Sequence, residues 1–126
     1  METPAQTLKR IVNRKPEKCA TLGESHWLHP IDMVEQLVLD GQLREIFART
    51  KEKIKDETIR EQVLSQGLTI GTIQLSLRDS EAPGAGLVFP SFEEAYAALA
   101  NKPEDAYAMF DLYARTFDLT MDEKKI

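Results

Sequence analysis

The sequence contains very little cysteine and histidine, and it has no long apolar run. Cys19 is the only cysteine in 126 residues, so no intrachain disulfide can form, as is usual in a reducing compartment. No apolar run approaches the roughly 20 residues that cross a bilayer. The first residues also lack the continuous apolar stretch of a signal peptide. We therefore expect a cytoplasmic protein without membrane contact.

Basic charge is scarce in the last third of the chain. The formal net charge is −5, and acidic residues outnumber basic ones from Asp79 onward. An acidic surface repels the phosphate backbone of nucleic acids. The charge pattern therefore disfavours a general nucleic-acid-binding function.

Residues suited to catalysis or metal binding are equally few. The two histidines, His26 and His29, lie three positions apart, so a general base elsewhere would have to be a carboxylate. Cys19, Glu24 and the histidines offer metal ligands, but their spacing matches no standard zinc pattern, and ordinary packing explains them. The glycine-containing segments lack the Lys-Ser/Thr of a phosphate loop. We predict no enzymatic activity, no bound metal and no cofactor.

Apolar residues make up 42% of the chain, which is enough for one hydrophobic core. Their spacing predicts a mainly α fold, a compact bundle of about five short helices in a single domain over residues 1–126. Thr3 and Pro4 are typical of a helix start. A second helix opens at Pro30 and is interrupted at Asp40-Gly41. Its apolar residues share one face: Ile31, Val34, Leu37 and Val38.

Three segments interrupt this helical pattern. Residues 16–29 have no clear periodicity and are predicted to form an irregular arm. The nearly all-charged run 51–57 indicates a solvated helix surface or a hinge between two helices. The last residues, 121–126, are expected to fray.

The segment 68–78 fits two kinds of secondary structure. Ile70, Ile73 and Leu77 fit one helical face, which we prefer, whereas the alternation over 72–77 is typical of a strand. The alternative is a small β-hairpin over 71–89. A helix-turn-helix motif over 61–77 would place a turn at Gly67. The inner positions of such a motif would hold polar residues here, and its recognition helix would offer only one basic residue, Arg78.

Beyond residue 90 the helix signals are sharper. Ser91 and Glu94 have the spacing of a capping box. Pro103 opens the last helix, with two acidic residues beside it that suit the helix dipole. The apolar spacing of these two helices predicts aromatic residues on their buried or contact faces: Phe92, Tyr96, Phe110 and Tyr113.

Residues 58–120 have a recognisable order of features. An acidic, glycine-containing loop, Asp79–Gly86, is followed by Phe89, by the helix start Ser91–Glu94 and by a break at Leu99–Pro103. In this order the segment resembles the C-terminal part of tail assembly chaperones from long-tailed phages. Residues 1–57 carry no feature of that family.

The resemblance implies a non-enzymatic protein that binds the tape-measure protein and keeps its apolar surface soluble in the host cytoplasm. Phe92, Tyr96, Phe110 and Tyr113 are then the partner-binding or core residues. Self-association is a further expectation that the sequence leaves open. Two alternatives remain: a small phage or mobile-element regulator that inhibits a host enzyme, and a helix-turn-helix DNA-binding regulator.

Overall fold

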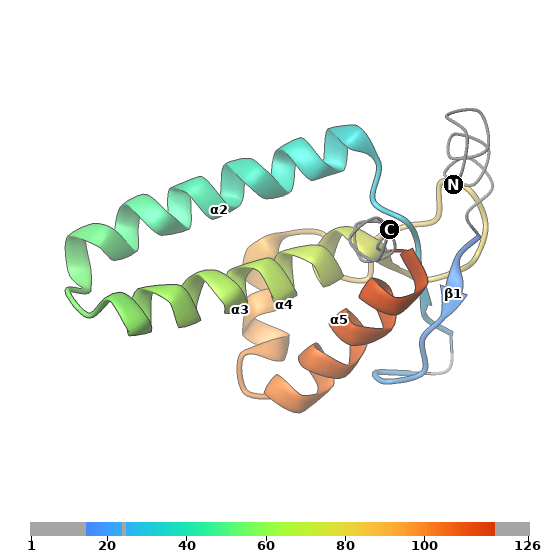
Figure 1. Cartoon of the computed structure of the whole chain (residues 1–126). Helices are drawn as coiled ribbons and strands as arrows, with labels where there is room; N and C mark the ends of the chain where they lie inside the picture. The colour runs from blue at the N-terminus through green and yellow to red at the C-terminus, as the bar shows by residue number, and fades with distance from the viewer. Residues whose placement is uncertain (1–14, 24, 118–126) are drawn as a thin grey trace, which may run out of the picture.

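The computed structural model describes residues 15–23 and 25–117, and it is mainly helical, as predicted (Figure 1). The helix expected from Thr3 and the tail 121–126 lie outside the described residues. The described part has four helices: α2 (Met33–Lys53), α3 (Glu57–Ser76), α4 (Phe92–Leu99) and α5 (Pro103–Phe117). It also has three two-residue strands: β1 (Glu17–Lys18), β2 (Trp27–Leu28) and β3 (Leu77–Arg78).

The two long helices α2 and α3 form a hairpin whose tip extends beyond α4 and α5 (Figure 1). Asp32 caps α2 in a capping box: its carboxylate accepts from the Glu35 backbone N–H at 2.7 Å, and the Glu35 carboxylate accepts from the Asp32 N–H at 3.2 Å. The helix therefore begins after Pro30, at Met33. The predicted interruption at Asp40-Gly41 is wrong, because an exposed glycine inside a helix costs only about 1 kcal/mol and packing on α3 exceeds this cost.

The charged run 51–57 contains the hinge between the two helices of the hairpin, which was one of the two predicted alternatives. Helix α2 ends at Lys53, and the Asp56 carboxylate caps α3 by accepting from the backbone N–H groups of Thr58 and Ile59, at 2.9 and 3.3 Å. Helix α3 then continues through Gly67 without a turn. The helix-turn-helix reading of 61–77 is therefore wrong, because Gly67 is buried in mid-helix against α2.

The strands form one antiparallel sheet in the order β1-β2-β3. Leu28 pairs with Leu77, and Trp27 pairs with Arg78, so β2 is the central strand. Within residues 16–29, β1 pairs with β2, and β2 pairs with β3, which directly follows α3. The preference for helix over 68–78 is confirmed for 68–76 and wrong for Leu77 and Arg78, which form β3. The alternative hairpin over 71–89 is reduced to this strand and an isolated bridge between Arg78 and Leu87.

The core lies where the C-terminal half of α3 meets the sheet, α4 and α5. Ser91 caps α4 by accepting from the Glu94 N–H at 3.2 Å, and Pro103 begins α5, both as predicted. The core residues come from β2, β3, α3, α4, α5 and the segment between β1 and β2, and none comes from α2: Cys19, Leu28, Ile70, Ile73, Leu77, Ala95, Leu99, Ala106, Met109 and Phe117. Helices α3, α4 and α5 each contribute an apolar face to this core, whereas the buried Leu39 of α2 packs against Gly71 of α3 outside it.

The guanidinium of Arg78 joins the sheet to α2 and to the following loop. Its Nη2 donates to the Glu35 carboxylate at 2.7 Å and its Nη1 donates to the Ala85 carbonyl at 2.9 Å. Both charged side chains are about four-fifths buried, with exposed fractions of 19% and 20%. Their pairing is therefore screened less by water than a surface pair.

A double-mutant cycle with Arg78→Met and Glu35→Gln should give a coupling energy of about 1–2 kcal/mol in urea unfolding. Glutamine keeps an oxygen for the capping box, so the cycle isolates the ion pair. The same cycle on the exposed pair Arg115 and Asp111 is the control, with an expected coupling of about 0.3–0.5 kcal/mol. Equal couplings for the two pairs would contradict this account of Arg78.

Candidate protein-binding surfaces

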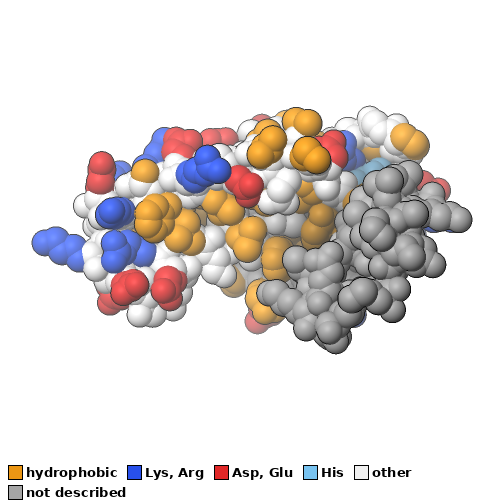
Figure 2. Space-filling model, turned by 45° about the horizontal axis from the view of Figure 1, so that its top comes forward, with side chains coloured by type: hydrophobic (Ala, Val, Ile, Leu, Met, Phe, Trp, Pro, Cys, Tyr) orange, Lys and Arg blue, Asp and Glu red, His pale blue; other side chains and the backbone are white. Residues whose placement is uncertain are grey.

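Large hydrophobic side chains remain exposed on several parts of the described surface. Figure 2 shows one such group over α2. Exposed apolar patches on a folded domain often mark sites of protein contact. The exposed large hydrophobic residues are Met33, Val34, Leu37, Val38, Phe47, Ile59, Leu68, Tyr96 and Tyr107.

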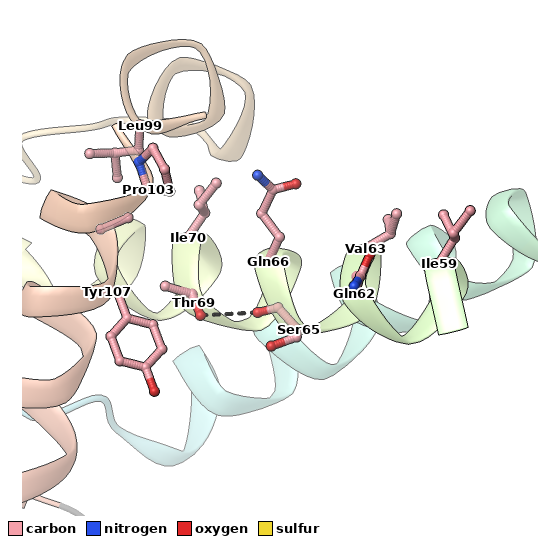
Figure 3. Close-up of a pocket in the computed structure, with 11 residues that line it drawn as sticks. Ile59, Gln62, Val63, Ser65, Gln66, Thr69, Ile70, Leu99, Pro103 and Tyr107 are labelled. Atoms are coloured by element: carbon pink, nitrogen blue, oxygen red, sulfur yellow. Dashed lines mark hydrogen bonds between the residues drawn. The ribbon is translucent and has the colours of Figure 1, made fainter. Parts of the chain in front are cut away.

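A groove of about 490 Å³, the α3–α5 groove, runs along α3 towards the junction of α4 and α5 (Figure 3). In Figure 3 its α3 residues lie in a row, while Leu99, Pro103 and Tyr107 lie at one end. The opposite end lies at Ile59, in the first turn of α3. Its lining residues are Ile59, Gln62, Val63, Ser65, Gln66, Thr69, Ile70, Leu99, Pro103, Ala106 and Tyr107.

The sequence of α3 produces this groove by helical spacing. Ile59, Val63, Gln66 and Ile70 recur at intervals of three and four residues, so they lie on one face. Only the Ile70 end of that face is buried, because α4 and α5 are too short to cover the rest of α3. From Ile59 to Ile70 the face is about 16 Å long at 1.5 Å per residue, or three helical turns.

None of the side chains that line the groove carries a charge, although 29% of the chain is charged. Its polar groups are the side-chain amides of Gln62 and Gln66 and the hydroxyls of Ser65, Thr69 and Tyr107. The Thr69 hydroxyl donates to the Ser65 carbonyl at 3.0 Å. Ile59 and Tyr107 are 45% and 67% exposed. This lining suits the burial of an apolar stripe with a few neutral hydrogen bonds at its rim.

A second concavity of about 450 Å³, the α2–α4 pocket, lies on another side of the hairpin. It is more polar, since it includes the Glu45–Arg49 ion pair and Glu93. The rings of Phe92 and Tyr96 lie 6.2 Å apart between their centroids. Its lining residues are Gln42, Glu45, Ile46, Arg49, Phe92, Glu93, Tyr96 and Ala97.

The structure divides the four predicted contact residues between two environments. Phe92 and Tyr96 line the α2–α4 pocket, and Tyr96 is 45% exposed. Phe110 and Tyr113 are half-buried on α5 against the core. The Tyr113 hydroxyl accepts from the Ile31 backbone N–H at 3.1 Å and so ties α5 to the segment before α2.

Sequence analysis did not single out the groove residues Ile59, Val63 and Tyr107 as a contact surface. The sequence shows that Ile59 and Val63 share a helical face, but it does not show how far along α3 the helices α4 and α5 cover that face. Tyr107 lies off the aromatic stripe of α5, so the spacing places it outside the core, but only the fold shows that it lines the groove beside α3.

The residues weighed as metal ligands lie in separate interactions. The Cys19 thiol is buried and lies 3.7 Å from the Thr21 hydroxyl. His29 Nε2 donates to the Ser80 carbonyl at 2.7 Å. Glu24 lies outside the described residues. Among residues 15–23 and 25–117, no three potential ligands gather as a metal site would require.

Comparisons with protein families, with curated proteins and with solved structures found no match to this chain. None of the described helices is long and apolar enough to span a membrane. The function therefore has to be argued from the surfaces themselves.

Proposed function

We propose that this protein is a non-enzymatic binding factor that holds an amphipathic helix of another protein in the α3–α5 groove. The observation that carries the proposal is an uncharged groove about three helical turns long on a chain in which 29% of the residues are charged. Helices that dock in grooves of this kind present apolar residues at i, i+3, i+4 and i+7.

The charge at one end of the groove favours a basic flank on the partner helix. Glu104 and Asp105 begin α5 beside Pro103, against the single base Lys102, whereas at the Ile59 end Lys55 and Arg60 accompany Glu57 and Glu61. Basic residues beyond the apolar stripe of a partner would therefore be attracted to the α5 end. The apolar stripe would supply most of the affinity, at about 25 cal/mol per Å² of buried apolar surface before the costs of association.

The resemblance of residues 58–120 to phage tail assembly chaperones suggests which partner has this chemistry. A tape-measure protein is long and helical, and its apolar stripes need a soluble cover until the tail tube encloses it. In this proposal the protein is that cover and acts in the host cytoplasm. Its net negative charge would keep the complex soluble.

Affinity capture with the tagged full-length protein tests the proposal when wild type and variants are compared. Tyr107→Glu places a charge in the groove without disturbing the core, since Tyr107 is 67% exposed. We expect capture of one long, helix-rich structural protein from a lysate of the source, and a loss of at least tenfold with Tyr107→Glu. This loss corresponds to about 1.4 kcal/mol of binding free energy.

Two matched variants locate the binding surface. Phe47→Glu changes an exposed aromatic residue of α2 that lines neither concavity, so it should capture as much partner as wild type. Tyr96→Glu changes the α2–α4 pocket instead. If only Tyr96→Glu loses the partner, the groove assignment is wrong. If the captured partner is a polymerase, a nuclease or another enzyme, the tail-chaperone reading is wrong and the inhibitory regulator takes its place.

A further inference from the structure

A glutamine interrupts the apolar face of α3 that lines the α3–α5 groove. Positions 59, 63, 66, 70 and 73 follow one another at intervals of four, three, four and three residues, so their side chains lie on one face of the helix. We call this face the α3 seam, and its residues are Ile59, Val63, Gln66, Ile70 and Ile73. Spacing of this kind is typical of a helix that packs along another helix, and Gln66 is the one polar residue in it.

The fold covers only one end of the α3 seam. Ile70 and Ile73 are 1% and 0% exposed, because they belong to the core that α3 shares with α4 and α5. Ile59 is 45% exposed, and Val63 and Gln66 are half-buried. Gln66 therefore lies in the open part of the seam, about one turn before the point at which the core begins.

The side-chain amide of Gln66 has no hydrogen-bond partner among residues 15–23 and 25–117. In Figure 3 it extends from α3 on the same side as Val63 and Ile70, and the hydrogen bond drawn in the groove joins Thr69 and Ser65 instead. An amide group has one acceptor oxygen and two donor hydrogens. Since the groove is open, water can satisfy these groups in the free protein.

A helix that docks in the groove would displace this water. A buried amide that is left without a partner costs more free energy than its hydrogen bond would gain. An apolar residue opposite Gln66 would leave the amide unpaired, and a charged residue would be buried beside Val63 and Ile70. An asparagine or glutamine both donates and accepts, so it can satisfy the Gln66 amide without adding a charge.

We propose that the partner helix carries an asparagine or glutamine within its apolar stripe and that this amide pairs with Gln66. The inference rests on the proposed function, to which it adds the register of the bound helix. A shift of the partner by one turn would leave both amides unpaired, so only one register satisfies them. Because Ile70 lies four residues beyond Gln66 at the acidic end of the groove, the partner's amide should lie about one to two turns from its basic flank.

In this proposal Gln66 selects among amphipathic helices rather than strengthening the binding of all of them. A helix with a wholly apolar stripe would bury more apolar surface, but it would also bury the unpaired amide. A single polar residue in a helix seam is known to fix register at a cost in stability. Gln66 is therefore a specificity-determining residue.

Binding of two synthetic peptides to the full-length protein tests the proposal. Both peptides are amphipathic helices of about four turns with one basic end and a leucine stripe, and they differ only at the central stripe position, which is asparagine or leucine. Fluorescence anisotropy measures the dissociation constant of each peptide. Relative to the leucine peptide, the asparagine peptide should bind at least tenfold better to wild type than to Gln66→Leu.

Gln62→Leu is the matched control, because Gln62 is an exposed amide one turn earlier on α3, at the edge of the groove. Its amide can stay in contact with water when a helix is bound, so the ratio of the two dissociation constants should remain that of wild type. Circular dichroism checks that each variant keeps its helix content. An equal change of the ratio in both variants would overturn the inference, because the effect would then follow from added apolar surface alone.

The peptides also separate this inference from the proposed function. If both peptides bind and Tyr107→Glu weakens both, but Gln66→Leu leaves their ratio unchanged, the proposed function stands and the pairing with Gln66 is wrong. If neither peptide binds wild type, or if Tyr107→Glu weakens neither, the groove does not hold a helix. The proposed function and the inference then both fail.

Discussion

Replacing Ile73 by alanine should lower the free energy of unfolding by about 3–4 kcal/mol. Ile73 is fully buried, with 0% of its surface exposed, and it belongs to the core cluster that α3 shares with the sheet, α4 and α5. Removing three carbon atoms there loses their burial and leaves a space that helices fixed on several sides close only in part. Urea unfolding followed by far-ultraviolet circular dichroism measures the change.

Leu68→Ala is the matched control for Ile73→Ala. Leu68 is an aliphatic residue on the same helix, but it is 39% exposed and lies outside the core cluster. Its replacement should cost about 1 kcal/mol or less, since alanine also has the higher helix propensity. Similar losses for the two variants would mean that the C-terminal half of α3 is not the centre of the core.

Replacing Gly71 by leucine should separate α2 from α3 and cost about 3 kcal/mol or more. A β-carbon at Gly71 would lie 2.5 Å from the Cδ1 atom of Leu39, which is itself buried, so even one added carbon requires repacking. A leucine adds three more carbon atoms, for which the seam has no space. Stability is measured by urea unfolding at low protein concentration, where any association of copies contributes little.

Gly41→Leu provides the comparison for Gly71→Leu. A β-carbon at Gly41 would meet nothing within 4 Å and the position is exposed, so this variant should gain up to about 1 kcal/mol from helix propensity. The two substitutions are chemically identical and lie on paired helices. The difference between their free energies of unfolding therefore measures how closely α2 and α3 pack at Gly71. A Gly71→Leu variant as stable as wild type would show that α2 and α3 do not pack closely at this level.

Local signals in the sequence predicted several element boundaries correctly. Ser91 and Pro103 begin or cap the last two helices as expected, because capping depends on residues within one turn. The charged run 51–57 also marked the hinge correctly, because it has no apolar face to bury. The spacing of Ile70 and Ile73 correctly favoured helix over strand, because both residues lie on the face of α3 that becomes core.

The sequence could not predict the sheet or the continuity of α2. Trp27 and Leu28 are a strand only because they pair with Arg78 and Leu77, some 50 residues away, and such short pairings leave no periodic signal. Asp40-Gly41 has the composition of a break, but packing of both halves of α2 along α3 keeps the helix continuous.

The candidate surfaces show the same division. By itself, the sequence determined that the protein is mainly helical, that its helices carry apolar faces, and that its charge is negative, because composition and spacing are properties of neighbouring residues. Tertiary structure alone decided which of those faces are covered: it buries Ile70 and leaves Ile59 open, and it packs Leu39 on α3 while Leu37 faces outward. The reason is physical, since burial depends on the length and placement of the neighbouring helices, and these result from long-range packing.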